Sequence, residues 1–252
     1  MPHIIAISAQ KGGSGKTTTA VSLSHALSKL GKKVLLVDLD PQGHSSEHFG
    51  IIPDNLPHEL SDVLDGSKRL TDIIIPGVRE NLDLAPSNIK LGDMELTLVR
   101  VNFREQKLKR ALDPILKRYD YVMLDCAPAL GLLTVNALVA AHQVIIPLAS
   151  DYFSMLGVSQ LLKTVEQVKS EANPKLEVLG ILPTQYKRTV HSREVVERIK
   201  AEMDGTVKVY PPVNESTKFR EASGMGKTIF EVAPNVPGAQ VYRQIAEEIA
   251  NG

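Results

Sequence analysis

The sequence is poor in cysteine, in aromatic residues and in net charge. Cys126 is the single cysteine among 252 residues, which excludes an internal disulfide and a metal site built from several thiolates. This cysteine usage is typical of a reducing compartment. Tryptophan is absent and aromatic residues make up 4% of the chain, so stacking on single-stranded bases is not expected. Lys and Arg total 29, as do Asp and Glu, so any nucleic-acid contact must come from a local patch.

Long hydrophobic runs are also missing. The most apolar later stretch, Leu132 to Ala141, contains Thr134 and Asn136 and reaches about half the length that spans a bilayer. The first residues lack the basic leader and apolar stretch of a signal peptide. With 43% apolar and 23% charged residues, the composition is that of a globular chain. We expect a cytoplasmic protein that has no membrane partner.

Short apolar runs alternate with longer segments of helical period, the pattern of βαβ units that build a parallel sheet. Strands are predicted at His3 to Ile7, Lys33 to Val37, Leu82 to Ala85, Tyr121 to Leu124, Gln143 to Leu148, Leu176 to Leu182 and Thr206 to Val209. Helices are predicted at Lys16 to Leu30, Glu105 to Tyr119, Leu156 to Lys169, Ser192 to Met203 and Gly238 to Ala250. The expected fold is α/β, a doubly wound and mostly parallel sheet with helices on both faces. No linker or repeat divides the chain, so residues 1–252 are expected to form one domain.

A glycine-rich turn follows the first predicted strand and precedes the first predicted helix. Its residues are Gln10, Lys11, Gly12, Gly13, Ser14, Gly15, Lys16, Thr17 and Thr18. Glycines let backbone N–H groups approach a polyphosphate, and the helix N-terminus adds positive potential. Lys16 is expected to reach the β and γ phosphates, and the Thr17 hydroxyl to ligate Mg²⁺.

The turn departs from the strict G-x-x-x-x-G-K-[ST] pattern, because Gln10 stands at the position of the first glycine. A glycine-rich turn with a solvated lysine is the simpler alternative. Gly226-Lys227-Thr228 shows that a GKT can arise by coincidence, since it follows no predicted strand. Two acidic strand ends favour the phosphate-binding interpretation of the first turn.

These acids are Asp38 and Asp40 after one strand and Asp125 after another. In an open parallel sheet, ligands bind beyond the carboxyl ends of the strands, so these carboxylates should face the same crevice as the glycine-rich turn. Asp125 suits a Walker-B carboxylate that holds Mg²⁺. One of Asp38 and Asp40 can order the water shell of the metal and the other the attacking water. The simpler alternatives are an Asp125 that caps a turn and an Asp40 that starts an Asp-Pro turn.

The motifs KGGSGKTTT, VDLDPQG and LDCAP resemble those of the ParA and MinD group of deviant-Walker ATPases, and most closely those of its ParA/Soj branch. The likeness continues through GILPTQY, GKTIFEVAP and the final predicted helix. The resemblance implies ATP and Mg²⁺ as cofactors, with Asp38 in the metal shell, Asp40 positioning the hydrolytic water and Asp125 as the Walker-B acid. Residues 38–50 and 126–133 would be switch-like loops.

The resemblance also implies a homodimer that encloses two ATP molecules. In this family the lysine that matches Lys11 crosses the dimer interface and contacts the phosphates of the partner, where a cation can stabilise the charge that develops on the γ-phosphoryl group. An ordinary exposed lysine is the alternative. The adenine is expected near Pro212 and Asn214, although proline and asparagine also make plain turns.

The output of such an ATPase depends on what the dimer binds. Lys187, Arg188, Lys218 and Arg220 lie in loop-like sequence and match roughly the region where relatives contact DNA without sequence specificity. The segment Arg100 to Arg118 is also basic and is interpreted as a solvated helix face. The expected function is therefore positioning of DNA or another cargo, with association with the nucleoid in the ATP-bound state. A cargo-bound ParB-like or adaptor protein is the expected stimulating partner.

Two other functions remain open. A MinD-like membrane ATPase would carry a basic amphipathic C-terminal helix, whereas Glu247 and Glu248 lie beside the apolar face of the final helix here. An ATP-binding switch module would bind ATP without turnover that depends on Asp40. An iron-protein reductase is excluded, because it needs two cluster cysteines in each subunit.

Overall fold

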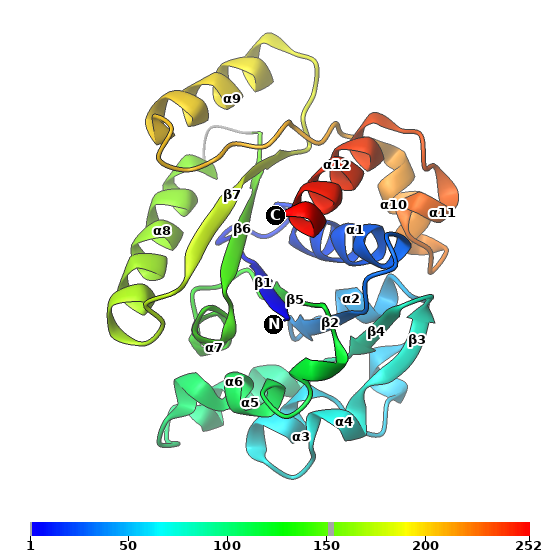
Figure 1. The fold of residues 1–252 in the computed structure, drawn as a ribbon, viewed down its shortest axis with the longest axis vertical. Coiled ribbons are helices and arrows are strands. Elements are labelled where there is room, and N and C mark those ends of the chain that lie inside the picture. Colours follow the sequence, from blue (N-terminus) through cyan, green and yellow to red (C-terminus); the bar gives the residue numbers. More distant parts are fainter. Residues whose placement is uncertain (1, 151–153) are drawn as a thin grey trace.

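The computed structural model describes residues 2–150 and 154–252, and its centre is a single sheet (Figure 1). The seven strands have the order β3-β4-β2-β5-β1-β6-β7. All neighbours are parallel except β3 and β4. The strands are β1 (His3–Ile7), β2 (Val34–Leu39), β3 (Ile75–Arg79), β4 (Leu82–Ala85), β5 (Tyr121–Cys126), β6 (Gln143–Ala149) and β7 (Glu177–Thr184).

Helices cover both faces of the sheet, as the expected fold requires (Figure 1). One face is covered by α1 (Lys16–Lys29), α10 (Thr217–Gly224), α11 (Ile229–Val232) and α12 (Pro237–Asn251). The other face is covered by α3 (Leu60–Asp65), α4 (Leu70–Ile73), α5 (Lys90–Leu98), α6 (Lys107–Leu112), α7 (Leu132–Ala140), α8 (Ser154–Glu171) and α9 (Val190–Met203). The short helix α2 (His44–Glu47) follows β2. Every residue of β2 and β5 is buried, which explains why these strands are apolar almost throughout.

The final helix packs on the core. Val241, Tyr242 and Ile245 are buried in the same cluster as Leu23 and Leu27 of α1. The apolar stripe of α12 is therefore covered by protein. Within the described residues, no helix combines the length and the hydropathy needed to cross a bilayer.

Two of the predicted elements are wrong, and β3 and several helices, among them α5 and α7, were not predicted. The helix predicted at Glu105 to Tyr119 is broken into a 3-10 turn (Arg104–Gln106), α6 and a second 3-10 turn (Leu116–Arg118), because Pro114 lacks the N–H that a continuous helix needs. The predicted strand at Thr206 to Val209 is reduced to an isolated bridge between Val209 and Ile181. It ends because Pro211 and Pro212 follow and cannot donate to a ladder. The antiparallel edge strand β3 was not predicted, since its sequence IPGVR contains both proline and glycine.

Candidate functional site: a phosphate loop beside three acidic residues

The acidic strand ends meet the glycine-rich loop at one edge of the sheet. β5 lies between β1 and β2, so Asp125 is in register with Ile7 on one side and with Asp38 on the other. The loop from Ser8 to Gly15 continues β1 at this same edge. The predicted convergence is thus present in the tertiary structure.

Strand periodicity also decides which way the acids point. Side chains two apart along a strand share a face. On β5, Tyr121 and Met123 pack in the cluster that contains α1, and Asp125 continues that series. On β2, Val34 and Leu36 pack in the same cluster, and Asp38 follows them. Both buried carboxylates therefore face the helix that begins with Lys16 and Thr17.

The loop has the backbone of an anion site. Gly13 and Gly15 have φ values of 72° and 84°, a left-handed conformation that residues with a Cβ rarely adopt. Gly15 is the N-cap of the 14-residue helix α1, and no side chain caps the helix there. The first N–H groups of α1 therefore remain available for an anionic ligand.

Lys16 is the cation of the site. Its side chain is buried, and its Nζ donates to the backbone oxygen of Lys11 at 3.4 Å. Burial lowers the pKa of Lys16, while the nearby charges of Asp125 and Asp40 act in the opposite direction. Lys16 is thus connected to the loop by a hydrogen bond and to the two acids by charge. A bound phosphate group would add a further negative charge near its ammonium group.

Asp38 and Asp125 are fully buried carboxylates on neighbouring strands. Burial raises the pKa of Asp125 to about 6, against hydrogen bonds from Ser45 and Thr17 and the charge of Lys16. Burial, together with the charge of Asp125, raises the pKa of Asp38 well above its usual range. A bound cation would therefore stabilise the ionised form of both carboxylates.

These residues fit a magnesium ion that is shared with a nucleotide. Asp125 Oδ1 is buried and has no hydrogen-bond partner, which is the condition expected of an oxygen awaiting a ligand. Carboxylate and hydroxyl oxygens are suitable ligands for Mg²⁺, which usually also keeps waters and substrate phosphates. Among the residues that the structure describes, no group of three His, Cys, Asp or Glu side chains could hold a metal without further ligands. Thr17, Asp125 and phosphate oxygens would therefore hold the ion, with Asp38 behind them.

Ser45, which the sequence analysis missed, joins the two buried acids. Its hydroxyl donates to Asp125 Oδ2 at 2.8 Å, and its backbone N–H donates to Asp38 Oδ2 at 3.1 Å. Gly43 makes this geometry possible, because it has a φ of 65° and a Cβ there would lie 2.7 Å from Pro53 Cγ. The only signal in the sequence for Ser45 is its position within the switch-like loop expected at residues 38–50.

Asp40 begins the turn that leads to Ser45. Its Oδ1 accepts from the backbone N–H of Gln42 at 3.0 Å, and its backbone oxygen accepts from Ser87 Oγ at 2.6 Å. The turn-forming role considered for Asp40 is thus present. Asp40 follows β2 at the edge of the sheet where the loop lies, and its charge also acts on Lys16.

The end of β7 holds the loop in place. Thr184 Oγ1 donates to the backbone oxygen of Ser14 at 2.8 Å, and the Gln185 amide donates to the backbone oxygen of Gly13. Both residues lie within the motif GILPTQY, but nothing in the sequence indicates these bonds. They fix the loop through residues 170 or more positions away.

A cavity of about 310 Å³ opens beside the loop. Gly15 and Thr18 form its wall on the loop side, and Asn214 and Phe219 lie in other parts of the wall. A cavity of this size suits the base and ribose of a nucleotide. Of the two residues predicted near the adenine, Asn214 lines this cavity and Pro212 does not.

The predicted DNA-contact residues lie on two neighbouring segments, which are joined where Tyr186 bridges Asn214. Lys187 pairs with Glu215 at 3.4 Å, and Lys218 pairs with Glu221 at 2.6 Å. Arg220 lines the nucleotide-sized cavity. Arg188 forms no ion pair with any described residue. The patch is therefore partly neutralised by its own acids.

The chain is similar to several known proteins. A family model described as "AAA domain" matches residues 2–178. The sporulation initiation inhibitor protein Soj of Bacillus subtilis is 42% identical over 252 residues, which cover 99% of this chain and 99% of Soj. The chromosome partitioning protein ParA of Caulobacter vibrioides is 37% identical, over 98% of this chain and 93% of that protein. The crystal structure of a protein named cobyrinic acid a,c-diamide synthase from Mycobacterium smegmatis, with bound ATP analog and magnesium, is 37% identical, has a TM-score of 0.87 and matches 100% of this chain and 95% of that one.

Proposed function

Because the chain belongs to the ParA/Soj family of partition ATPases, we propose that it binds Mg²⁺-ATP at the loop from Lys11 to Thr18 and hydrolyses it to move DNA or another cargo. One observation carries the proposal: Lys16, Asp38, Asp40 and Asp125 come from three separate strand ends and converge beside an uncapped helix N-terminus. The related structure that contains an ATP analog and magnesium supports the same ligand here.

The residues of the loop bind the triphosphate. The N–H groups of the loop and of the first turn of α1 donate to phosphate oxygens, and Lys16 supplies the opposite charge. The cavity beside Gly15 and Asn214 receives the base and ribose. When bound, Mg²⁺ supplies charge neutralisation for the β and γ phosphates. Thr17 and Asp125 would hold the ion, and Asp38 would orient its shell.

Hydrolysis requires a positioned water and a further cation. Asp40 follows β2 at the edge of the sheet that carries the loop, and its charge acts on Lys16. Its carboxylate can accept a hydrogen bond from the attacking water, which would orient the water toward the γ phosphate. Lys11 is exposed at the mouth of the loop. In a dimer that encloses two ATP molecules it would contact the phosphates of the partner, where it stabilises the developing charge.

Cargo positioning then requires that the ATP dimer binds a surface. We assign non-sequence-specific duplex DNA to the patch around Lys187, Arg188, Lys218 and Arg220. Two copies of a modest patch gain avidity when ATP brings them together. The names Soj and chromosome partitioning protein ParA support a DNA cargo and a ParB-like stimulating partner. Association with the nucleoid would follow from DNA binding.

Nucleotide binding and turnover of purified variants test this proposal. Lys16→Ala should lose binding of a fluorescent ATP analogue, because a buried cation at the phosphates is removed. Lys227→Ala is the matched control, since it alters the other GKT sequence at an exposed position and should bind normally. Asp40→Ala should bind ATP and form the dimer but lose most turnover, by about 10²-fold or more.

Three results would contradict parts of the proposal. Normal hydrolysis by Asp40→Ala would remove Asp40 from the mechanism, and ATP binding without any turnover in the unaltered protein would indicate a switch module. An undisturbed ATP dimer of Lys11→Ala in sedimentation would reject the role of Lys11 across the interface. Unchanged DNA binding by the double variant Lys218→Glu, Arg220→Glu would reject the DNA patch, with the ATP affinity measured in parallel because Arg220 also lines the cavity.

A further inference from the structure

A second cavity, of about 490 Å³, is lined by residues of α4 and α6. Both helices cover the face of the sheet opposite α1 (Figure 1). Its floor is apolar and is formed by Val63, Leu70, Ala111 and Ile115. None of its lining residues belongs to the nucleotide-sized cavity. A volume of this size can receive one or two large apolar side chains of a ligand.

Every charged residue that lines this cavity is cationic, and we refer to these exposed or half-buried cations as its rim. Lys68, Arg69, Lys107, Arg110 and Arg118 line it, and no acidic residue does. Three of these come from the basic segment between residues 100 and 118, which the sequence analysis interpreted as a solvated helix face. The structure instead gathers them with Lys68 and Arg69 around one concavity. The protein as a whole has no net charge, so this concentration of one sign is local.

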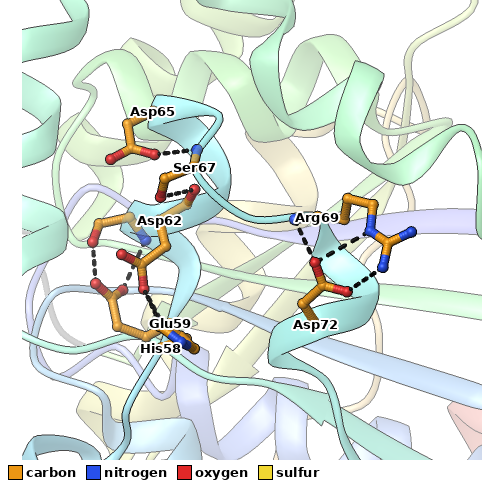
Figure 2. A network of polar contacts seen from close by, with 8 residues as sticks. His58, Glu59, Asp62, Asp65, Ser67, Arg69 and Asp72 are labelled. Carbon is orange, nitrogen blue, oxygen red and sulfur yellow. Dashed lines mark hydrogen bonds and ion pairs between the residues drawn. The ribbon is translucent and has the colours of Figure 1, made fainter.

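Most of these cations have no acidic partner within the described part of the chain. Arg69 is the exception, because its guanidinium bonds Asp72 at 2.9 Å and 3.2 Å, as Figure 2 shows. Lys68, Lys107, Arg110 and Arg118 take part in no ion pair among the residues described. Like charges gathered without counter-charges favour an anionic occupant.

The wall on the α3–α4 side is braced by a local hydrogen-bond network (Figure 2). The Asp62 carboxylate accepts from the backbone N–H of Glu59 at 3.0 Å, and Ser67 donates to the backbone oxygen of Asp62 at 3.0 Å. The loop that carries Lys68 is thereby tied to α3. A preformed wall reduces the conformational cost of binding.

The wall on the α6 side is fixed to the body of the protein by Asn136 of α7. Its side chain accepts from the N–H of Leu108 at 3.1 Å and donates to the backbone oxygen of Arg104 at 2.8 Å. An exposed aromatic ring adjoins this wall. Phe103 is 63% exposed and has a φ of 55°, and the Arg110 guanidinium lies 5.2 Å from the centre of its ring. A bulky residue held exposed in a left-handed conformation offers apolar surface beside the cationic rim.

We propose that this cavity docks an acidic segment of a partner protein, which inserts an apolar side chain onto the floor while its carboxylates pair with the cations of the rim. The apolar floor favours a peptide over duplex DNA, because DNA phosphates need a basic surface but no apolar concavity. The exposed ring of Phe103 provides further contact for apolar side chains of the same segment. The proposal is independent of ATP binding, since no residue is shared with the loop.

The test uses fluorescence anisotropy with the full chain and a short fluorescein-labelled peptide in which leucines alternate with glutamates. The unaltered protein should bind it at low salt, and binding should weaken as salt increases. The double variant Lys107→Glu, Arg118→Glu should bind about ten-fold more weakly or worse, because it reverses two rim charges. Lys109→Glu is the control, since Lys109 is on α6 and exposed but does not line the cavity. It should retain most of the affinity.

A second variant separates the cavity from general charge effects. Ala111→Phe fills the floor without altering any charge and should also weaken binding of the peptide. A peptide with serines in place of leucines should bind less well to the unaltered protein than the leucine peptide. Absence of peptide binding, or equal loss in Lys109→Glu and in the double variant, would overturn the proposal. So would a loss of duplex DNA binding in the double variant without any peptide binding, because the rim would then serve DNA. Circular dichroism and ATP binding confirm that each variant is folded.

Discussion

Replacing Asp125 by asparagine should stabilise the protein at neutral pH while removing its response to magnesium. The Asp125 carboxylate is fully buried, and burial raises its pKa to about 6 from an ordinary value of 3.8. An acid whose folded pKa is raised binds more protons in the folded state than in the unfolded state. Stability is therefore highest below pH 3.8 as far as this group is concerned, and it is lost as pH rises through about 6.

The magnitude follows from the size of the shift. A difference of about two pKa units corresponds to about 3 kcal/mol of unfolding free energy at pH 7. Asparagine has nearly the same shape and no charge, and its amide oxygen, placed where Oδ2 lies in Asp125, can accept the hydrogen bond that Ser45 donates. The variant should recover much of this free energy at pH 7. The gain should disappear as pH approaches 3.8.

Urea unfolding from pH 4 to pH 8 measures this difference, with Asp113→Asn as an exposed control that should show no comparable gain. Unfolding in the presence of ATP, with and without Mg²⁺, then tests the metal. The unaltered protein should gain further stability from Mg²⁺ through its binding to the folded state, and Asp125→Asn should gain little. The measured quantity is the gain in unfolding free energy of Asp125→Asn over the unaltered protein. If this gain is no larger at pH 7 than at pH 4, burial does not raise the pKa of Asp125 as argued. A full Mg²⁺ response would refute its role as a ligand.

Two further predictions concern the surroundings of the site. His25 lies on α1 with its Nδ1 2.6 Å from Thr228 Oγ1, and burial lowers its pKa to about 4. Below pH 6.5 the unfolded chain takes up a proton that the folded chain does not, so His25→Gln should remove about 3 kcal/mol of the stability lost between pH 6.5 and pH 4. An unchanged pH profile in urea unfolding would reject this. Gly43→Ala should cost about 2–4 kcal/mol, because it combines a left-handed backbone with overlap against Pro53. Gly77→Ala has a similar φ, 64°, but open space around its Cβ and should cost only about 1–2 kcal/mol in the same thermal or urea assay. Equal costs would show that the overlap is relieved.

Local chemistry made the phosphate loop and the acidic strand ends predictable. The glycines of the loop, the helix that follows and the acids after apolar strands are all neighbours in the sequence. A parallel sheet brings the carboxyl ends of its strands to one edge, so Asp38 and Asp125 had to lie near Lys16. The sequence therefore determined the kind of fold and the edge of the sheet where the loop meets the acids.

Tertiary structure alone decided the contacts between distant segments. The bridge that Ser45 makes between Asp38 and Asp125 depends on the register of β2 against β5, and the bonds from Thr184 and Gln185 to the loop depend on the packing of β7. The same is true of the cationic rim, where residues of α6 meet Lys68 and Arg69 because both helices cover one face of the sheet. Such contacts depend on how whole helices and strands pack, and the sequence of one segment does not indicate where the other lies.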